Sequence, residues 1–357
     1  MIVNLLLFIV LSAIGFLFSV PIFFYVNKNI NPEYAFKKDA WVYMWLFSLI
    51  GVLCICYFTP DFYDIVISLN YKYLLLPFGL SALIYIAFLF EINKLLYSIM
   101  AISSVIITSI IPENITIFDN YISLPVERMI IFSSLFLITF FSKILNGMSA
   151  VFGIFIITVL FGISLITLLG GLPVIFGIIT SLLCGMWLNF LRYNWYPSEI
   201  FLNDGACASA GFLVACLLLY SCFEYAAGSM FILATYLFAE IILVMTRQYI
   251  FRIKEPDFYY NTSYYICYMK DISAQAILMA LVRIGIINVI FASFQIYAPN
   301  LFSLPMFVLV ADLWLLNMLY NATEEKTDIR QINQALVEDV KDGLKIVKKS
   351  LNKRKRQ

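Results

Sequence analysis

The sequence contains no histidine, and only 13% of its 357 residues are charged. Without histidine, the chain cannot use a histidine base, a histidine metal ligand, or a Ser–His or Cys–His nucleophile pair. The 23 Lys and Arg residues nearly balance the 22 Asp and Glu residues, which leaves a net charge of +1. This net charge indicates no particular partner, and no nucleic-acid partner is expected.

Apolar residues, by contrast, are abundant. Hydrophobic residues make up 63% of the chain, aromatic residues 17%, and the mean hydropathy is +0.93. A soluble domain could not bury so much apolar surface, so we predict an all-α, polytopic integral membrane protein. The seven cysteines lie mostly within apolar runs, and Cys54 and Cys56 lack the second pair that a zinc site would need. We interpret them as small packing residues.

Apolar runs long enough to cross about 30 Å of hydrocarbon recur along the chain. They predict about eleven transmembrane helices, near 2–26, 41–59, 71–90, 95–111, 128–146, 151–169, 172–190, 206–223, 226–246, 275–297 and 301–320. The first run has no basic region before it, so we expect a retained span rather than a signal peptide. The prediction is therefore a transmembrane domain over residues 1–320 and a cytoplasmic tail over 321–357.

Lysine and arginine are concentrated in alternate connections between these runs. The first, third, fifth, seventh and ninth connections hold Lys28, Lys37, Lys38, Lys94, Lys143, Arg192, Arg247, Arg252, Lys254 and Lys270. The even-numbered connections offer only Lys72 and Arg128, both at span edges. By the positive-inside rule, the N-terminus is expected outside and the C-terminus inside. The polar connections 27–40, 191–205 and 247–274 would then face the cytoplasm, where nucleotide-activated substrates are found.

The tail over 324–357 has a different composition. Its apolar residues recur at intervals of three and four, at Ile329, Ile332, Leu336, Val340, Leu344, Val347 and Leu351, and it ends in a basic run. This spacing predicts an amphipathic helix. One interpretation is that the helix lies on anionic lipid. The other is that it pairs with a second copy, forming a homodimer, or with a protein partner in envelope assembly.

The connection 191–205 carries the most informative motif. Asn194, Pro197, Phe201, Leu202, Asn203 and Asp204 follow one another in that order, and small residues fill 205–211. This order resembles a motif of the polyprenyl-phosphate N-acetylhexosamine-1-phosphate transferase family. Its members have about ten or eleven spans and move a sugar-1-phosphate from a UDP-sugar to undecaprenyl phosphate, using Mg²⁺. The resemblance covers roughly residues 1–300 and implies a place in the bacterial inner membrane. It also implies that Asp204 is a catalytic carboxylate and Mg²⁺ ligand.

A second family motif, Asn-x-x-Asp-Gly-x-Asp-Gly, corresponds to the connection 143–150. Gly147 is kept, whereas the two acidic positions hold Asn146 and Ser149, and Lys143 replaces the leading Asn. The family's paired aspartates correspond to 90–94, where Glu91 is the one acid. The histidines of a late family loop fall on Thr262, Tyr264 and Tyr265.

Phosphoryl transfer to a lipid phosphate depends chiefly on charge neutralisation, and losing several of the groups involved removes the usual mechanism. We therefore expect a catalytically degenerate relative that binds polyprenyl phosphate or a UDP-sugar, or acts as a scaffold subunit, without a cofactor. The alternative is an active, atypical transferase in which Asp204 and Glu91 hold Mg²⁺. The candidate substrate-binding residues are Asn194, Lys143, Asn146, Arg192 and Arg252, although the arginines also fit positive-inside anchoring.

Three charged residues, Glu240, Arg283 and Asp312, fall within predicted spans. Charges in a membrane are expensive and usually paired, so we expect Arg283 to pair with Asp312 or Glu240 as a structural link. The alternative is that the three residues line a path in a lipid or solute transporter.

Overall fold

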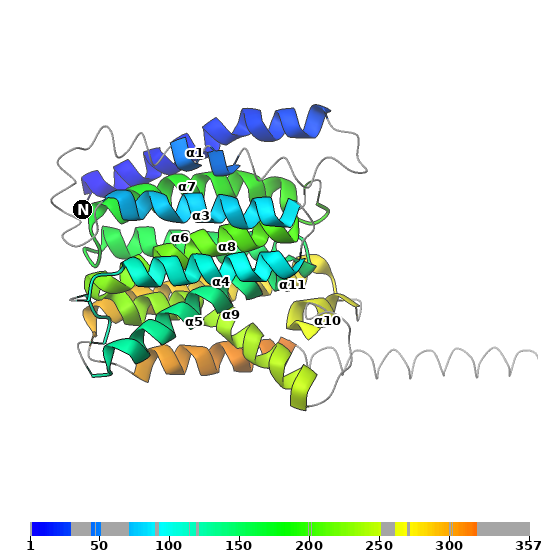
Figure 1. Cartoon of the computed structure of the whole chain (residues 1–357). Helices are drawn as coiled ribbons and strands as arrows, with labels where there is room; N and C mark the ends of the chain where they lie inside the picture. Colours follow the sequence, from blue (N-terminus) through cyan, green and yellow to red (C-terminus); the bar gives the residue numbers. More distant parts are fainter. Residues whose placement is uncertain are drawn as a thin grey trace, which may run out of the picture.

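The computed structural model describes residues 2–29, 44–46, 48–50, 71–89, 93–113, 115–118, 121–198, 200, 202–250, 261–269, 272–299, 301 and 303–319. All regular secondary structure in these ranges is helical, as the composition predicts. The long helices run roughly side by side in several layers, and the short helix α10 lies at one end of the bundle (Figure 1). The predicted tail over 321–357 lies outside the described residues.

The helices follow one another along the chain with short connections. In order they are α1 (Ile2–Asn29), α3 (Tyr71–Leu89), α4 (Asn93–Ile110), α5 (Leu124–Ser142), the 3₁₀-helix η2 (Ile144–Gly147), α6 (Val151–Leu168), α7 (Val174–Asn194), α8 (Asp204–Ser221), the π-helix η3 (Cys222–Ala226), α9 (Ala227–Met245), the π-helix η4 (Thr246–Ile250), α10 (Ser263–Met269) and α11 (Ala274–Tyr297). A last apolar helix covers Ser303–Leu319.

Seven helical segments in the described part of the chain have the length and apolar composition needed to cross a membrane. They are Asn4–Pro21, Leu124–Gly147, Val151–Leu168, Val174–Asn194, Asp204–Glu224, Ala227–Tyr249 and Ala274–Tyr297. Shorter apolar helices cover Leu76–Phe88, Leu96–Ile110 and Ser303–Leu319. Each predicted run except 41–59, which lies largely outside the described residues, coincides with a described helix. The total of eleven spans and the orientation stay predictions.

Helix α8 lies in the interior of the bundle and is buried along most of its length. Its small residues allow this position. A Cβ on Gly205 would overlap the ring of Phe88 in α3, and a Cβ on Gly211 would overlap Ser142 in α5. The Ser209 hydroxyl donates a hydrogen bond to the Ser81 carbonyl of α3 at 2.7 Å. Small residues permit close helix approach in membranes, so the run after Asp204 has a packing reason of its own.

Helices α1 and α7 also pack backbone against backbone. Gly185 of α7 leaves no room for a Cβ beside the Ser12 carbonyl of α1, and Gly15 of α1 lies equally close to the Leu182 carbonyl. The Asn189 amide donates to the Ser19 hydroxyl at 2.8 Å, which adds a buried polar link. Close contact through glycines, supplemented by interhelical hydrogen bonds, is the usual way in which helices associate where water is absent.

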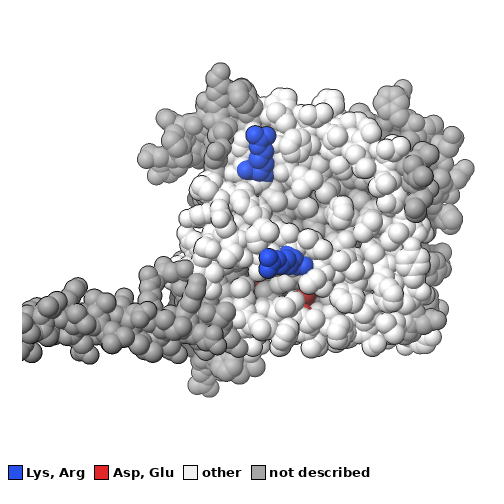
Figure 2. Space-filling model, turned by 180° about the vertical axis from the view of Figure 1, so that it is seen from behind, with Lys and Arg blue, Asp and Glu red and all other residues white. Residues whose placement is uncertain are grey.

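The surface of the bundle is poor in charge. In the described part of the face that Figure 2 shows, basic and acidic side chains are sparse among uncharged atoms. Large apolar side chains are exposed on several helices, among them Leu17 of α1, Met129 of α5, Ile290 of α11 and Phe307 and Trp314 of the helix 303–319. An exposed apolar surface of this extent fits contact with lipid.

Candidate functional site

The two polar connections that carry the motifs, 143–150 and 194–205, meet at one place, which we call the loop junction. The Asn146 amide donates to the Leu202 carbonyl at 2.9 Å and to the Asp204 Oδ1 at 3.1 Å. The hydroxyls of Ser149 and Ser198 lie 2.8 Å apart, within hydrogen-bond distance. The structure therefore brings Asn146 and Asp204, which are far apart in the sequence, into direct contact.

Asn194 holds the loop junction together from inside. It is 6% exposed, its Oδ1 accepts from the Ala150 backbone N–H at 2.7 Å, and its Nδ2 donates to the Ile200 carbonyl at 2.6 Å. Ala150 has a positive φ of 70°, which is uncommon for a residue other than glycine, and Asn194 satisfies its N–H. The predicted substrate-binding role of Asn194 would therefore require breaking two internal hydrogen bonds.

Asp204 is exposed and lies in the first turn of α8. Asn203 caps this helix, because its side chain accepts from the Ala206 N–H at 2.7 Å. A negative charge in the first turn interacts favourably with the helix dipole, so Asp204 has a structural role that needs no metal. The adjacent Gly205 packs on Phe88, which precedes Glu91 by three positions in the sequence. Glu91 itself lies outside the described residues.

The predicted basic residues differ in their surroundings. Lys143 donates to the Tyr97 hydroxyl at 2.9 Å, and its ammonium lies 4.4 Å from the centre of the Tyr97 ring and 4.7 Å from that of Phe140. This cation–π arrangement holds Lys143 against α4 and α5. Arg192 is exposed near the end of α7, beside the ring of Tyr193. Arg252 lies outside the described residues.

A third segment reaches the loop junction from α10, which the sequence comparison aligned with the family's histidine loop. Tyr264 is fully buried and donates to the Ile144 carbonyl of η2 at 2.5 Å. Burial raises the pKa of the Tyr264 phenol, which therefore stays a neutral hydrogen-bond donor. Thr262 is also buried, so two of the three aligned positions lie in the interior.

Two charged side chains near the end of α9 hold the start of α10. The Glu240 Oε2 accepts from the Ser263 backbone N–H at 3.1 Å. Arg247, in η4, donates to the Asn261 carbonyl at 2.7 Å and to the Ser263 hydroxyl at 3.1 Å. Both charges are buried. They connect the end of a long apolar helix to the segment that contacts η2.

The predicted pairing of Arg283 with Asp312 or Glu240 is not formed. Arg283 is exposed on α11, whereas Asp312 and Glu240 are each 1% exposed. Asp312 accepts a hydrogen bond from Asn288, and Glu240 accepts one from Ser263. The exposed position of Arg283 spares its charge from burial, which is why it needs neither carboxylate as a partner.

The residues around Asp204 do not form a two-carboxylate metal site in the described part of the chain. No group of three or more Cys, Asp and Glu side chains is placed to hold an ion there. The Oδ1 of Asp204 is engaged by the neutral amide of Asn146. Mg²⁺ prefers carboxylate and phosphate oxygens, so these neighbours do not fit the metal that the resemblance implies.

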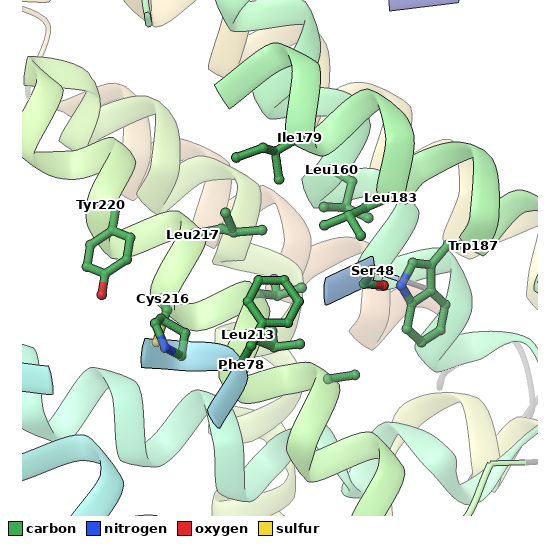
Figure 3. Close-up of a pocket in the computed structure, with 13 residues that line it drawn as sticks. Ser48, Phe78, Leu160, Ile179, Leu183, Trp187, Leu213, Cys216, Leu217 and Tyr220 are labelled. Carbon is green, nitrogen blue, oxygen red and sulfur yellow. The ribbon is translucent and has the colours of Figure 1, made fainter. Parts of the chain in front are cut away.

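The bundle contains a small apolar cavity of about 40 Å³ (Figure 3). Its lining comes from α3, α6, α7 and α8 together with Ser48, and includes Phe78, Leu183, Trp187 and Tyr220. The Ser48 hydroxyl already donates to the Met44 carbonyl at 2.7 Å. The cavity is far smaller than a site for a lipid chain or a sugar nucleotide.

These features define an all-helical protein whose long apolar helices have the character of a membrane-embedded bundle, with a polar loop junction at the helix ends. No protein-family model and no curated protein sequence matches the chain.

The sequence pattern identified the connections that meet at the loop junction, but not the bonds that join them. Asn146, Asp204 and Asn194 were predicted at one site, and the structure brings them together. The contributions of Ser198 and Tyr264 were missed. A fully apolar segment flanking Tyr264 would have been a signal of burial, but the polar and aromatic residues around it indicate an exposed loop instead.

Proposed function

We propose that this chain is a non-catalytic relative of the polyprenyl-phosphate N-acetylhexosamine-1-phosphate transferases, acting in the bacterial cytoplasmic membrane. Its role would be to bind a polyprenyl phosphate lipid or to hold other proteins of envelope polysaccharide assembly. This proposal rests on the sequence resemblance together with the arrangement of the loop junction.

The observation that carries the proposal is the contact between Asn146 and Asp204. In the resembled family the position of Asn146 is acidic, and acidic groups there would share a metal. An amide instead donates a hydrogen bond to the Asp204 carboxylate. The two motif connections thus keep their contact, while the pair no longer offers two anionic oxygens to a cation. This substitution favours a retained fold with altered chemistry.

A lipid-binding role is compatible with the rest of the described surface. The cavity of about 40 Å³ is too small for an isoprenoid chain, so the chain would lie against exposed apolar side chains on the outside of the bundle. Arg192 is exposed near the loop junction and is a candidate contact for the lipid phosphate. Lys143 is a second candidate, although its ammonium is already held by Tyr97.

The test is a paired measurement on the full-length protein in detergent or nanodiscs. Native mass spectrometry would measure retention of undecaprenyl phosphate, and a radiolabelled UDP-N-acetylhexosamine assay with Mg²⁺ would measure transfer. The proposal predicts lipid retention, at least severalfold weaker in Arg192→Gln, and no transferred sugar phosphate. Absence of retention contradicts the lipid-binding role.

The alternative is an active, atypical transferase that uses Asp204 with Glu91. It predicts Mg²⁺-dependent product that disappears in Asp204→Ala and Glu91→Gln. Asn146→Asp is an informative third variant, because it restores an acid next to Asp204. Product formed by the wild-type chain overturns the non-catalytic proposal, whereas product formed only by Asn146→Asp supports loss of activity through that position.

A further inference from the structure

A group of buried polar residues lies between α9, α11 and the helix 303–319, away from the loop junction. Asn288 of α11 is fully buried, and its Nδ2 donates to the Oδ2 of Asp312 at 2.9 Å and to the Thr235 hydroxyl oxygen of α9 at 3.1 Å. The Thr235 hydroxyl itself donates to the Ile232 carbonyl at 2.7 Å. All three residues fall near the middle of long apolar helices. We call Thr235, Asn288 and Asp312 the interior triad.

The interior triad has spare acceptors and no spare donor. Among the described residues, the Oδ1 of Asp312 and the Oδ1 of Asn288 are buried and have no hydrogen-bond partner. Both amide hydrogens of Asn288 and the single hydrogen of Thr235 are available only through atoms already engaged. An unmet acceptor inside an apolar bundle costs free energy, and a positively charged species satisfies it.

The surrounding charges set the size of the missing positive charge. Asp312 supplies one negative charge, and the nearby groups on α9 are the neutral phenol of Tyr236 and the Glu240 carboxylate, whose Oε2 is already bonded to Ser263. Arg247 lies beyond Glu240, at the α10 end of α9, and Arg283 is exposed. One unit of positive charge therefore neutralises the triad, whereas a divalent ion would leave a buried excess.

From this geometry we infer that the interior triad is a binding site for one small monovalent cation, with Asp312 and Asn288 supplying the oxygens. Na⁺ and a proton share this chemistry, since either satisfies the acceptors and cancels the charge of Asp312. Tyr236 contributes a further buried hydroxyl, which also has no hydrogen-bond partner in the described residues. The inference is independent of the function proposed for the loop junction.

The experiment measures thermal unfolding of the full-length protein in detergent at a fixed scan rate, with NaCl, KCl or choline chloride at equal ionic strength. Saturable stabilisation by Na⁺ of roughly 2–4 °C, lost in Asp312→Asn and weakened in Asn288→Ala, supports Na⁺ as the occupant. Glu224→Gln, which changes a partly exposed carboxylate outside the triad, is the matched control and keeps the response.

A second arm distinguishes a proton from Na⁺. The same scans are run in choline chloride from pH 5 to pH 9, with wild type and Asp312→Asn compared at each pH. A pH-dependent difference between the two proteins, without any Na⁺ effect, identifies the proton as the cation. Wild-type scans that respond neither to Na⁺ nor to pH overturn the inference, and this outcome does not depend on whether the variants fold.

Discussion

The loop junction and the interior triad use the same side chains under opposite conditions. At the loop junction, Asn146 donates to the exposed Asp204, whose remaining oxygen can bond to water. In the interior triad, Asn288 donates to Asp312 in the same way, but both residues are buried and each keeps an oxygen without a partner in the described chain. An Asn–Asp hydrogen bond is thus sufficient at a surface and incomplete in an apolar interior. Predictions follow from this contrast between interior and surface.

The largest effect is expected where the interior has no space at all. Gly185→Ile places a branched side chain against the Ser12 carbonyl of α1, so α1 and α7 cannot pack as observed. We expect loss of monodisperse protein on size-exclusion chromatography. Gly79→Ile is the matched control, because nothing lies within 4 Å of the Cβ position there. Equal recovery of the two variants would contradict the α1–α7 packing.

A buried charge at the α9–α10 contact comes next. Glu240→Leu removes the acceptor of the Ser263 N–H and leaves Arg247 buried beside an apolar side chain. Breaking such an arrangement costs about 3–5 kcal/mol, which corresponds to a large drop in the apparent unfolding midpoint. Glu224→Leu, at a partly exposed position, is expected to change the midpoint little. Similar midpoints for the two variants would show that burial of Glu240 is unimportant.

Asn194 lies between the two extremes, being buried within the loop junction. Asn194→Ala leaves the Ala150 N–H and the Ile200 carbonyl without their partner. We expect destabilisation of about 1–3 kcal/mol, measured as a lower unfolding midpoint and as faster proteolysis of the 194–205 connection. Asn194→Asp keeps the acceptor for Ala150 but loses the donor for Ile200, so it should fall between wild type and Asn194→Ala.

The smallest effect is expected at Asp204. Asp204→Asn keeps an oxygen that can accept from Asn146, and the side chain is exposed. The expected change in stability is within about 0.5 kcal/mol, as for most surface substitutions. Thermal scans beside Asn194→Ala provide the comparison. A larger loss at Asp204 than at Asn194 would reverse the assignment of which residue supports the loop junction.

The helical class and the position of each described helix could be predicted, because long apolar runs report directly on membrane-spanning length. The partners of polar residues could not. Asp312 and Arg283 are both charges within apolar runs, and composition favours pairing them, but α11 turns Arg283 to the surface and Asn288 toward Asp312. Which face of a helix points inward is decided by neighbouring helices, and α11 is apolar on nearly every face.

The loop junction shows the same division. The order of Asn194, Pro197 and Asp204 indicated a shared site with 143–150, and the hydrogen bonds between these connections agree with that expectation. That Asn194 faces the interior and Asp204 the surface depends on where α7 ends and α8 begins. The fate of Glu91 and Arg252 stays a prediction, since both lie outside the described residues.

The glycine contact between α1 and α7 has a consequence for how the protein is made. Ser12 and Gly185 touch in the folded chain, yet they are synthesised far apart in time. At typical rates of about 5–20 residues per second, α1 waits on the order of ten to thirty seconds before α7 leaves the ribosome. During this interval its glycine and serine face has no partner from α7. A nascent-chain crosslink between α1 and the insertion machinery should therefore persist until α7 emerges, and then vanish.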